Sequence, residues 1–184
     1  HNFYLAIDTF NDENDRSEQL IFKSYELSPE APFSNDRSYY EVLAEKYDVH
    51  VQSHCSESDW AHQFVIERFG ESDTKSLNKF GLLNDKSVMA HCGFLSAEDA
   101  EIFRETGTAV AHCPISNAYF GNAVTRVKQL LHDYQVDVGL GTDISGGFSP
   151  SLYDNMKQAV MSSRMLNDGV NHEIESDERG VSNS

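Results

Sequence analysis

The sequence is poor in several kinds of residue, and each shortage excludes a class of protein. It holds 14 Lys+Arg against 30 Asp+Glu, a formal net charge of −16, with no cluster of basic residues. Nucleic-acid backbones are bound by clustered cations, so we expect no nucleic-acid partner. No apolar run approaches the roughly 20 residues that span a bilayer, so we expect no membrane partner. Three cysteines are an odd number for a disulfide framework and favour a reducing, cytoplasmic location.

The chain also lacks the glycine-rich motifs of phosphate-binding folds, since neither G-x-G-x-x-G nor a Walker loop occurs. Its 184 residues are enough for one domain with a sizeable core. They are fewer than the about 250 residues of a typical (β/α)8 barrel.

From residue 39 onward, segments with strand and helix patterns alternate. Alternation of this kind predicts an α/β fold with parallel strands, which is either a doubly wound sheet or part of a β/α barrel. We therefore divide the chain into an uncertain segment 1–38, with strand candidates at 3–7 and 20–27, a β/α unit 39–170 that carries the site, and a polar tail 171–184. The expected strands are 48–54, 87–92, 108–113 and 136–142, and the expected helices are 39–47, 58–70, 96–107, 124–131 and 152–169.

All four of these later strands end at or beside a titratable residue, namely His54, His91, His112 and Asp143. The carboxyl ends of parallel strands are where β/α folds assemble their sites. Glu57 follows His54 by three residues and is expected to reach the same pocket. Histidine and carboxylate ligands suit zinc or iron, so the pattern predicts a metal site.

Each of the three histidines is followed directly by a cysteine: Cys55, Cys92 and Cys113. Neighbouring residues on a strand point to opposite faces of the sheet. If the histidines face the site, the thiols face the helices and act as small apolar residues. We therefore expect no cysteine in the site.

Four motifs, VQSHCSE, VMAHC, VAHCPISN and GLGTDISGGFSPS, occur in this order along the chain. Together they resemble the C-terminal half of the metal-dependent amidohydrolase superfamily, in its guanine deaminase branch, over residues 36–169. The resemblance implies a partial (β/α)8 TIM-type barrel, roughly its last four βα units.

For the catalytic residues, the resemblance implies that His54 and Asp143 bind one zinc ion, with iron as a possible substitute. Asp143 is implied to serve also as general base, and Glu57 as the proton shuttle. His91 is implied to orient the hydroxide that attacks the substrate.

For the substrate, the resemblance implies a purine contacted by Glu57, with His112 and Asn117 shaping the pocket floor and its loop. The implied reaction is hydrolysis of guanine to xanthine and ammonia, a step of purine catabolism.

The superfamily's H-x-H pair, which supplies two further zinc ligands, occurs nowhere in the sequence. We therefore expect a fragment that forms a homodimer or needs the missing barrel half. Two alternatives stay open: an inert structural or assembly fragment, and a related aminohydrolase acting on another aminated heterocycle.

Overall fold

The described part of the chain is built on a parallel sheet of five strands in chain order. The computed structural model describes residues 4–7, 44 and 46–168. All four neighbouring pairs are parallel, in the order β1-β2-β3-β4-β5. The strands are β1 (Tyr4–Ile7), β2 (His50–Cys55), β3 (Ser87–His91), β4 (Ala109–His112) and β5 (Val138–Leu140).

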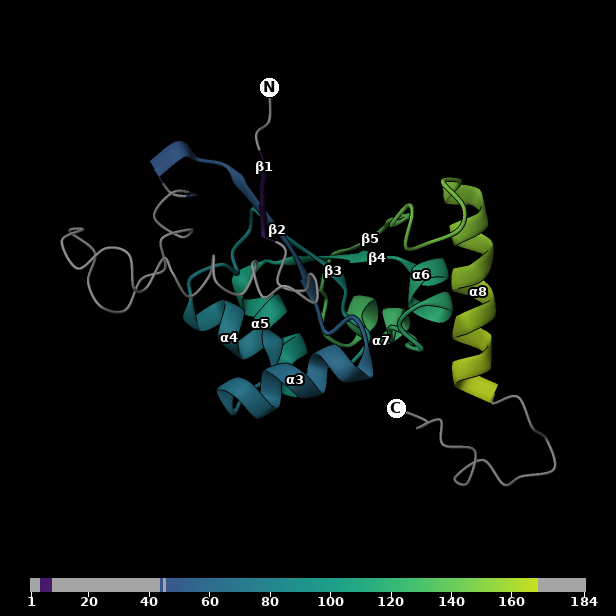
Figure 1. Cartoon of the computed structure of the whole chain (residues 1–184), viewed down its shortest axis with the longest axis horizontal. Helices are drawn as coiled ribbons and strands as arrows, with labels where there is room; N and C mark the ends of the chain where they lie inside the picture. Colours follow the sequence, from purple (N-terminus) through teal and green to yellow (C-terminus); the bar gives the residue numbers. More distant parts are fainter. Residues whose placement is uncertain (1–3, 8–43, 45, 169–184) are drawn as a thin grey trace.

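Helices connect the strands from β2 onward. Figure 1 shows α3, α4, α5 and α7 on one side of the sheet, with α6 and α8 beside each other at its far end. No helix of the described residues is long and apolar enough to cross a membrane. The helices are α3 (Asp59–Phe69), α4 (Asp73–Lys79), α5 (Ala97–Thr106), α6 (Pro114–Tyr119), α7 (Val127–His132) and α8 (Leu152–Asp168).

Local capping explains where the connecting helices begin and end. The Ser58 hydroxyl accepts a hydrogen bond from the Ala61 amide at the start of α3. Ser96 and Asp99 form a reciprocal capping box at the start of α5, as their spacing predicts. The α5 helix then ends at Gly107, whose φ of +73° is a left-handed conformation that glycine adopts without strain.

The core lies between the sheet and the helices on its covered face. Val51 and Cys55 of β2, Met89 of β3 and Val110 of β4 belong to one buried cluster with Phe103 of α5. The alternation along β2 places His54 on the opposite face from Val51 and Cys55. The strands that lead to the site are thus fixed by packing on the helix-covered face of the sheet, while His54 faces away from the helices.

The parallel α/β architecture and the partial barrel are confirmed, and the strand candidate at 3–7 contributes a fifth strand, β1. The helices α4 and α6 were not expected from the sequence. The expected strand at 136–142 is shorter, so Asp143 lies three residues beyond β5. The strand candidate at 20–27 and the tail 171–184 lie outside the described residues, and the division of the chain at 39 and 171 stays a prediction.

Candidate active site

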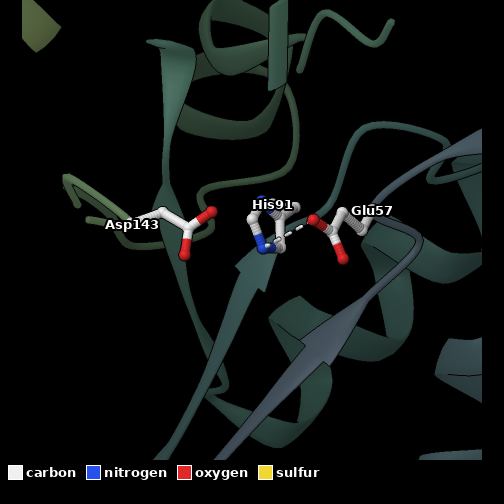
Figure 2. Close-up of side chains that lie close together, drawn as sticks. All are labelled: Glu57, His91 and Asp143. Atoms are coloured by element: carbon white, nitrogen blue, oxygen red, sulfur yellow. Dashed lines mark ion pairs between the residues drawn. The ribbon is translucent and has the colours of Figure 1, made fainter. Parts of the chain in front are cut away.

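Three of the predicted residues converge beyond the carboxyl ends of the strands. Glu57 lies in the loop after β2, His91 is the last residue of β3, and Asp143 follows β5. One ligand atom from each lies within 4.8 Å of the other two. Figure 2 shows the carboxylates of Glu57 and Asp143 on opposite sides of the His91 ring. The convergence that the sequence predicts for these three residues is thus present in the structure.

The backbone turns sharply where these side chains leave the strands. Ser56, His91 and Asp143 have φ values of +47°, +72° and +45°, in a region that non-glycine residues seldom occupy. Such conformations concentrate at functional sites, where surrounding contacts hold them in place. Positive φ values therefore occur where each of the three converging side chains leaves its strand, and they occur also at Asp48, Asn122 and Gln135 away from these positions.

His91 is completely buried, with 0% of its side chain exposed, and both of its ring nitrogens face polar groups. Nδ1 lies 2.9 Å from Oδ1 of Asn117 on α6. Nε2 makes no hydrogen bond and lies 3.7 Å from Oε1 of Glu57, whose side chain is 14% exposed. His91 therefore directs a buried nitrogen, which makes no hydrogen bond, at the Glu57 carboxylate.

Asp143 is held by its neighbours on α6 and in its own loop. The Ser116 hydroxyl donates to Oδ2 of Asp143 at 2.5 Å. The backbone oxygen of Asp143 accepts a hydrogen bond from the Gly147 amide at 2.6 Å. A β-carbon on Gly146 would lie 2.5 Å from the same carboxylate oxygen, so a side chain at position 146 would displace the Asp143 carboxylate. Glycine at position 146 therefore leaves the space that the carboxylate occupies.

A second polar group supports the loop that carries Glu57. Oδ2 of the buried Asp73 accepts a hydrogen bond from the Ser56 amide at 2.7 Å. Nδ1 of His62 lies 3.1 Å from the Ser56 hydroxyl and 3.4 Å from Oδ1 of Asp73. The hydrogen bond with Asp73 raises the pKa of His62, against the opposing effect of burial. Asp73 thus links α4 to the residue directly before Glu57.

His54, the predicted metal ligand on β2, lies beside the converging group. The centroid of its ring is 5.2 Å from that of His91, with the two planes inclined by 49°. No ring nitrogen of His54 belongs to the group of ligand atoms from Glu57, His91 and Asp143 that lie within 4.8 Å of one another. The assignment of His54 as a metal ligand stays a prediction.

His112 occupies a different environment from the other strand-end histidines. In the alternating pattern of β4, His112 takes a buried position on the same face as Val110. It also lines a groove between α7 and α8, together with Leu131 and Ala159. Burial, with a smaller effect of the nearby His91, lowers the pKa of His112 to about 4. The structure thus keeps His112 neutral and does not bring it into the Glu57–His91–Asp143 group, so its contact with a substrate stays a prediction.

The cysteines are free and buried, and two of them pack where the alternation predicts. Cys55 and Cys92 belong to the core cluster on the helix side of the sheet. Cys113 departs from this pattern, because His112 takes the same face of β4 as the core residue Val110, and Cys113 is buried outside the core cluster, beside Gly141. Burial and the charge of Asp143 raise the pKa of the Cys113 thiol to about 12, so it carries no thiolate at neutral pH.

The donor set fits a divalent cation. Two carboxylates and one imidazole offer the oxygen and nitrogen ligands of zinc and iron, and the Nε2 of His91, which makes no hydrogen bond, is directed at the Glu57 carboxylate. The residues that hold this group in place were not predicted from the sequence, and they include Ser116, Thr125 and Asp73. Serine, threonine and aspartate are frequent in loops and helix starts, so their types and positions gave no signal of this role.

The chain is similar to known proteins over most of its length. Residues 7–181 match the model of the amidohydrolase family. The guanine deaminases of Pongo abelii and Homo sapiens are each 39% identical over 126 residues, which is 67% of this chain and 28% of each relative. The crystal structure of guanine deaminase from C. acetobutylicum with bound guanine superposes with a TM-score of 0.64 at 31% identity, over 68% of this chain and 30% of that one. The chain therefore spans less than a third of the length of these relatives.

Proposed function

Since the chain belongs to the amidohydrolase family, we propose that it carries the catalytic carboxylates of an aminohydrolase that converts guanine to xanthine and ammonia. The observation that carries this proposal is the convergence of Glu57, His91 and Asp143 within 4.8 Å. The similarity to guanine deaminases supports guanine as the proposed substrate.

We propose that the site holds one divalent ion, zinc or alternatively iron. His54 and Asp143 are its proposed ligands, with Glu57 and His91 close enough to complete or adjust the site. A divalent ion bound there supplies Lewis-acid activation of water at neutral pH.

The residues of the site transfer protons and position the purine. Asp143 acts as the general base that takes a proton from the attacking water. Glu57 carries a proton to the ring nitrogen beside the reacting carbon. His91 orients the attacking water through Nε2 and, once Nε2 has gained a proton, stabilises the negative charge that develops on that carbon's oxygen. His112 and Asn117 shape the floor of the pocket from below. The water oxygen bonds to the ring carbon that carries the amino group, the amino group takes up the proton held by Asp143, and the carbon–nitrogen bond breaks to release ammonia. The new hydroxyl group returns its proton to Glu57 and becomes the carbonyl of xanthine.

The test is xanthine formation by the complete product of the gene, loaded with zinc and supplied with guanine. Glu57→Gln keeps the shape of the side chain but removes its proton transfer, and we expect kcat to fall by about 10²–10⁴-fold. The control is Glu67→Gln, which removes the same charge from an exposed position on α3 and leaves kcat unaltered. Turnover of another aminated heterocycle but not guanine would overturn the substrate assignment, and equal rates for parent and Glu57→Gln would overturn the role of Glu57.

We also propose that the sheet is closed by further strands, supplied by a second copy or by additional chain. Within the described residues β5 pairs with β4 alone, and an unpaired parallel edge is normally covered. A light-scattering mass for this 184-residue chain tests the proposal. A dimer supports pairing between copies. A soluble monomer contradicts pairing between copies and leaves additional chain as the source of the strands. A stable dimer without turnover favours the inert assembly fragment.

We place the protein in the cytoplasm. Its three cysteines are all free and buried among the described residues, a usage typical of a reducing compartment. Recovery of the protein from a membrane or secreted fraction would contradict this location.

A further inference from the structure

His91 is part of a closed network of buried hydrogen bonds that joins three separate segments of the chain. Asn117 lies on α6 and Thr125 lies in the segment before α7, and these two residues are 1% and 3% exposed. Thr125 Oγ1 lies 2.7 Å from the backbone oxygen of His91 and 2.8 Å from Nδ2 of Asn117. Nδ2 of Asn117 also lies 3.4 Å from the His91 oxygen.

The direction of each hydrogen bond follows from the chemistry of the groups. A backbone oxygen only accepts, so the Thr125 hydroxyl donates to the His91 carbonyl. The Thr125 oxygen then accepts from Nδ2 of Asn117, which fixes the orientation of the amide. The remaining amide atom, Oδ1, only accepts and faces Nδ1 of His91 at 2.9 Å. In this network, Nδ1 of the neutral ring must carry the proton.

The opposite amide orientation would disrupt the network. It would direct Oδ1 of Asn117 at the carbonyl oxygen of His91, which places two acceptors against each other. The Thr125 hydroxyl has one proton and could then satisfy only one of the two oxygens. Because the surroundings are buried, an unsatisfied polar atom there is costly, and the first orientation is favoured.

We propose that Asn117 and Thr125 are positioning residues that hold His91 as the Nδ1–H tautomer. This tautomer leaves the lone pair of Nε2 directed at Glu57, 3.7 Å away. The importance of the tautomer for turnover rests on the proposed function, because Nε2 is then the ring atom that gains or gives a proton on the side of Glu57. The tautomer itself is a property of the chain and is measured without substrate.

The test is the tautomer of His91 in the ¹⁵N-labelled 184-residue chain, measured without substrate or metal. Two-bond ¹H–¹⁵N correlations distinguish a protonated from an unprotonated ring nitrogen, and the His91 signals are identified by their loss in His91→Gln. The spectra are recorded well above pH about 6.5, where an unperturbed histidine is neutral. We expect a protonated Nδ1 and an unprotonated Nε2. A protonated Nε2 would overturn the proposal.

Variants of Asn117 and Thr125 distinguish control of the His91 tautomer from a merely structural role of these two residues. Asn117→Leu keeps the size of the side chain without its acceptor, and Thr125→Val keeps the shape without the hydroxyl. In each, we expect the ratio of Nδ1–H to Nε2–H forms to fall by about two- to twelvefold, which is the ratio that one ordinary buried hydrogen bond supports. Thr125→Ser restores the hydroxyl and should restore the ratio, while the exposed His132 stays unchanged in every variant.

The outcomes decide between the proposals. If Asn117→Leu fails to fold, the Thr125→Val and Thr125→Ser pair decides. An unchanged tautomer ratio in Thr125→Val, or a loss that serine does not restore, contradicts the network. A correct tautomer in a protein that forms no xanthine overturns the proposed function alone, and xanthine formation with the wrong tautomer overturns this inference alone.

Discussion

Gly146 is the position where one methyl group should disturb the candidate site most selectively. Its β-carbon would lie 2.5 Å from Oδ2 of Asp143 and 3.3 Å from the Ser116 hydroxyl. Ordinary contact begins at 3.4 Å, so Gly146→Ala must move the carboxylate by the difference, about 0.9 Å. That displacement exceeds the roughly 0.5 Å within which a functional site must be held.

We therefore expect Gly146→Ala to weaken zinc binding by the chain about ten- to a hundredfold, the range seen when the support of a metal ligand is disturbed. The free energy of unfolding should change little, because the atom that must move is the end of a side chain. Zinc affinity is measured by competition with a chromophoric chelator, and stability by urea unfolding.

Gly139→Ala is the matched control, because a β-carbon at that position on β5 would meet nothing within 4 Å. It should bind zinc as the parent does. Zinc binding by Gly146→Ala as tight as that of the parent, or an equal loss of affinity in Gly139→Ala, would contradict this role of Gly146.

Three further predictions concern the surroundings of the site. Asp73 raises the pKa of His62 above its usual 6.5, so the stability this pair contributes is complete below that pH and is lost as pH rises through the raised pKa. The difference in unfolding free energy between the parent and His62→Gln should therefore shrink with rising pH, and a difference that grows would contradict the pairing. Cys113, with its pKa raised to about 12, should resist a thiol reagent in the native chain and react in urea, and rapid native labelling would show that the thiol is not buried as described. Phe103 is fully buried, so Phe103→Ala should lower the free energy of unfolding by about 3–5 kcal/mol in urea titrations, and a loss below about 1 kcal/mol would contradict its place in the core.

The strands were predictable because each contains a β-branched valine or isoleucine and is followed or preceded by a segment with a different pattern. The helix α6 was not, since the six residues of PISNAY are too short to show a helical repeat. In α4, seven mostly polar residues give no apolar stripe, although Ser72 caps its first turn.

The residues that form the candidate site were predictable, but the contacts that hold them in place were less so. Strand order places the loops after β2, β3 and β5 at one end of the sheet, so the convergence of Glu57, His91 and Asp143 follows from the pattern. The contact between Ser116 and Asp143 spans 27 positions, and that between Thr125 and His91 spans 34. Contacts of this kind depend on how the loops pack, which a local residue pattern does not encode.

The most direct test of the account is a crystal structure of the zinc-loaded protein, with anomalous diffraction recorded at the zinc edge. We expect a zinc peak at bonding distance, about 2.0–2.2 Å, from the Asp143 carboxylate and the His54 imidazole, with Glu57 and His91 beside it. A protein that binds no zinc at this position, or binds it only at other residues, would contradict the central claim.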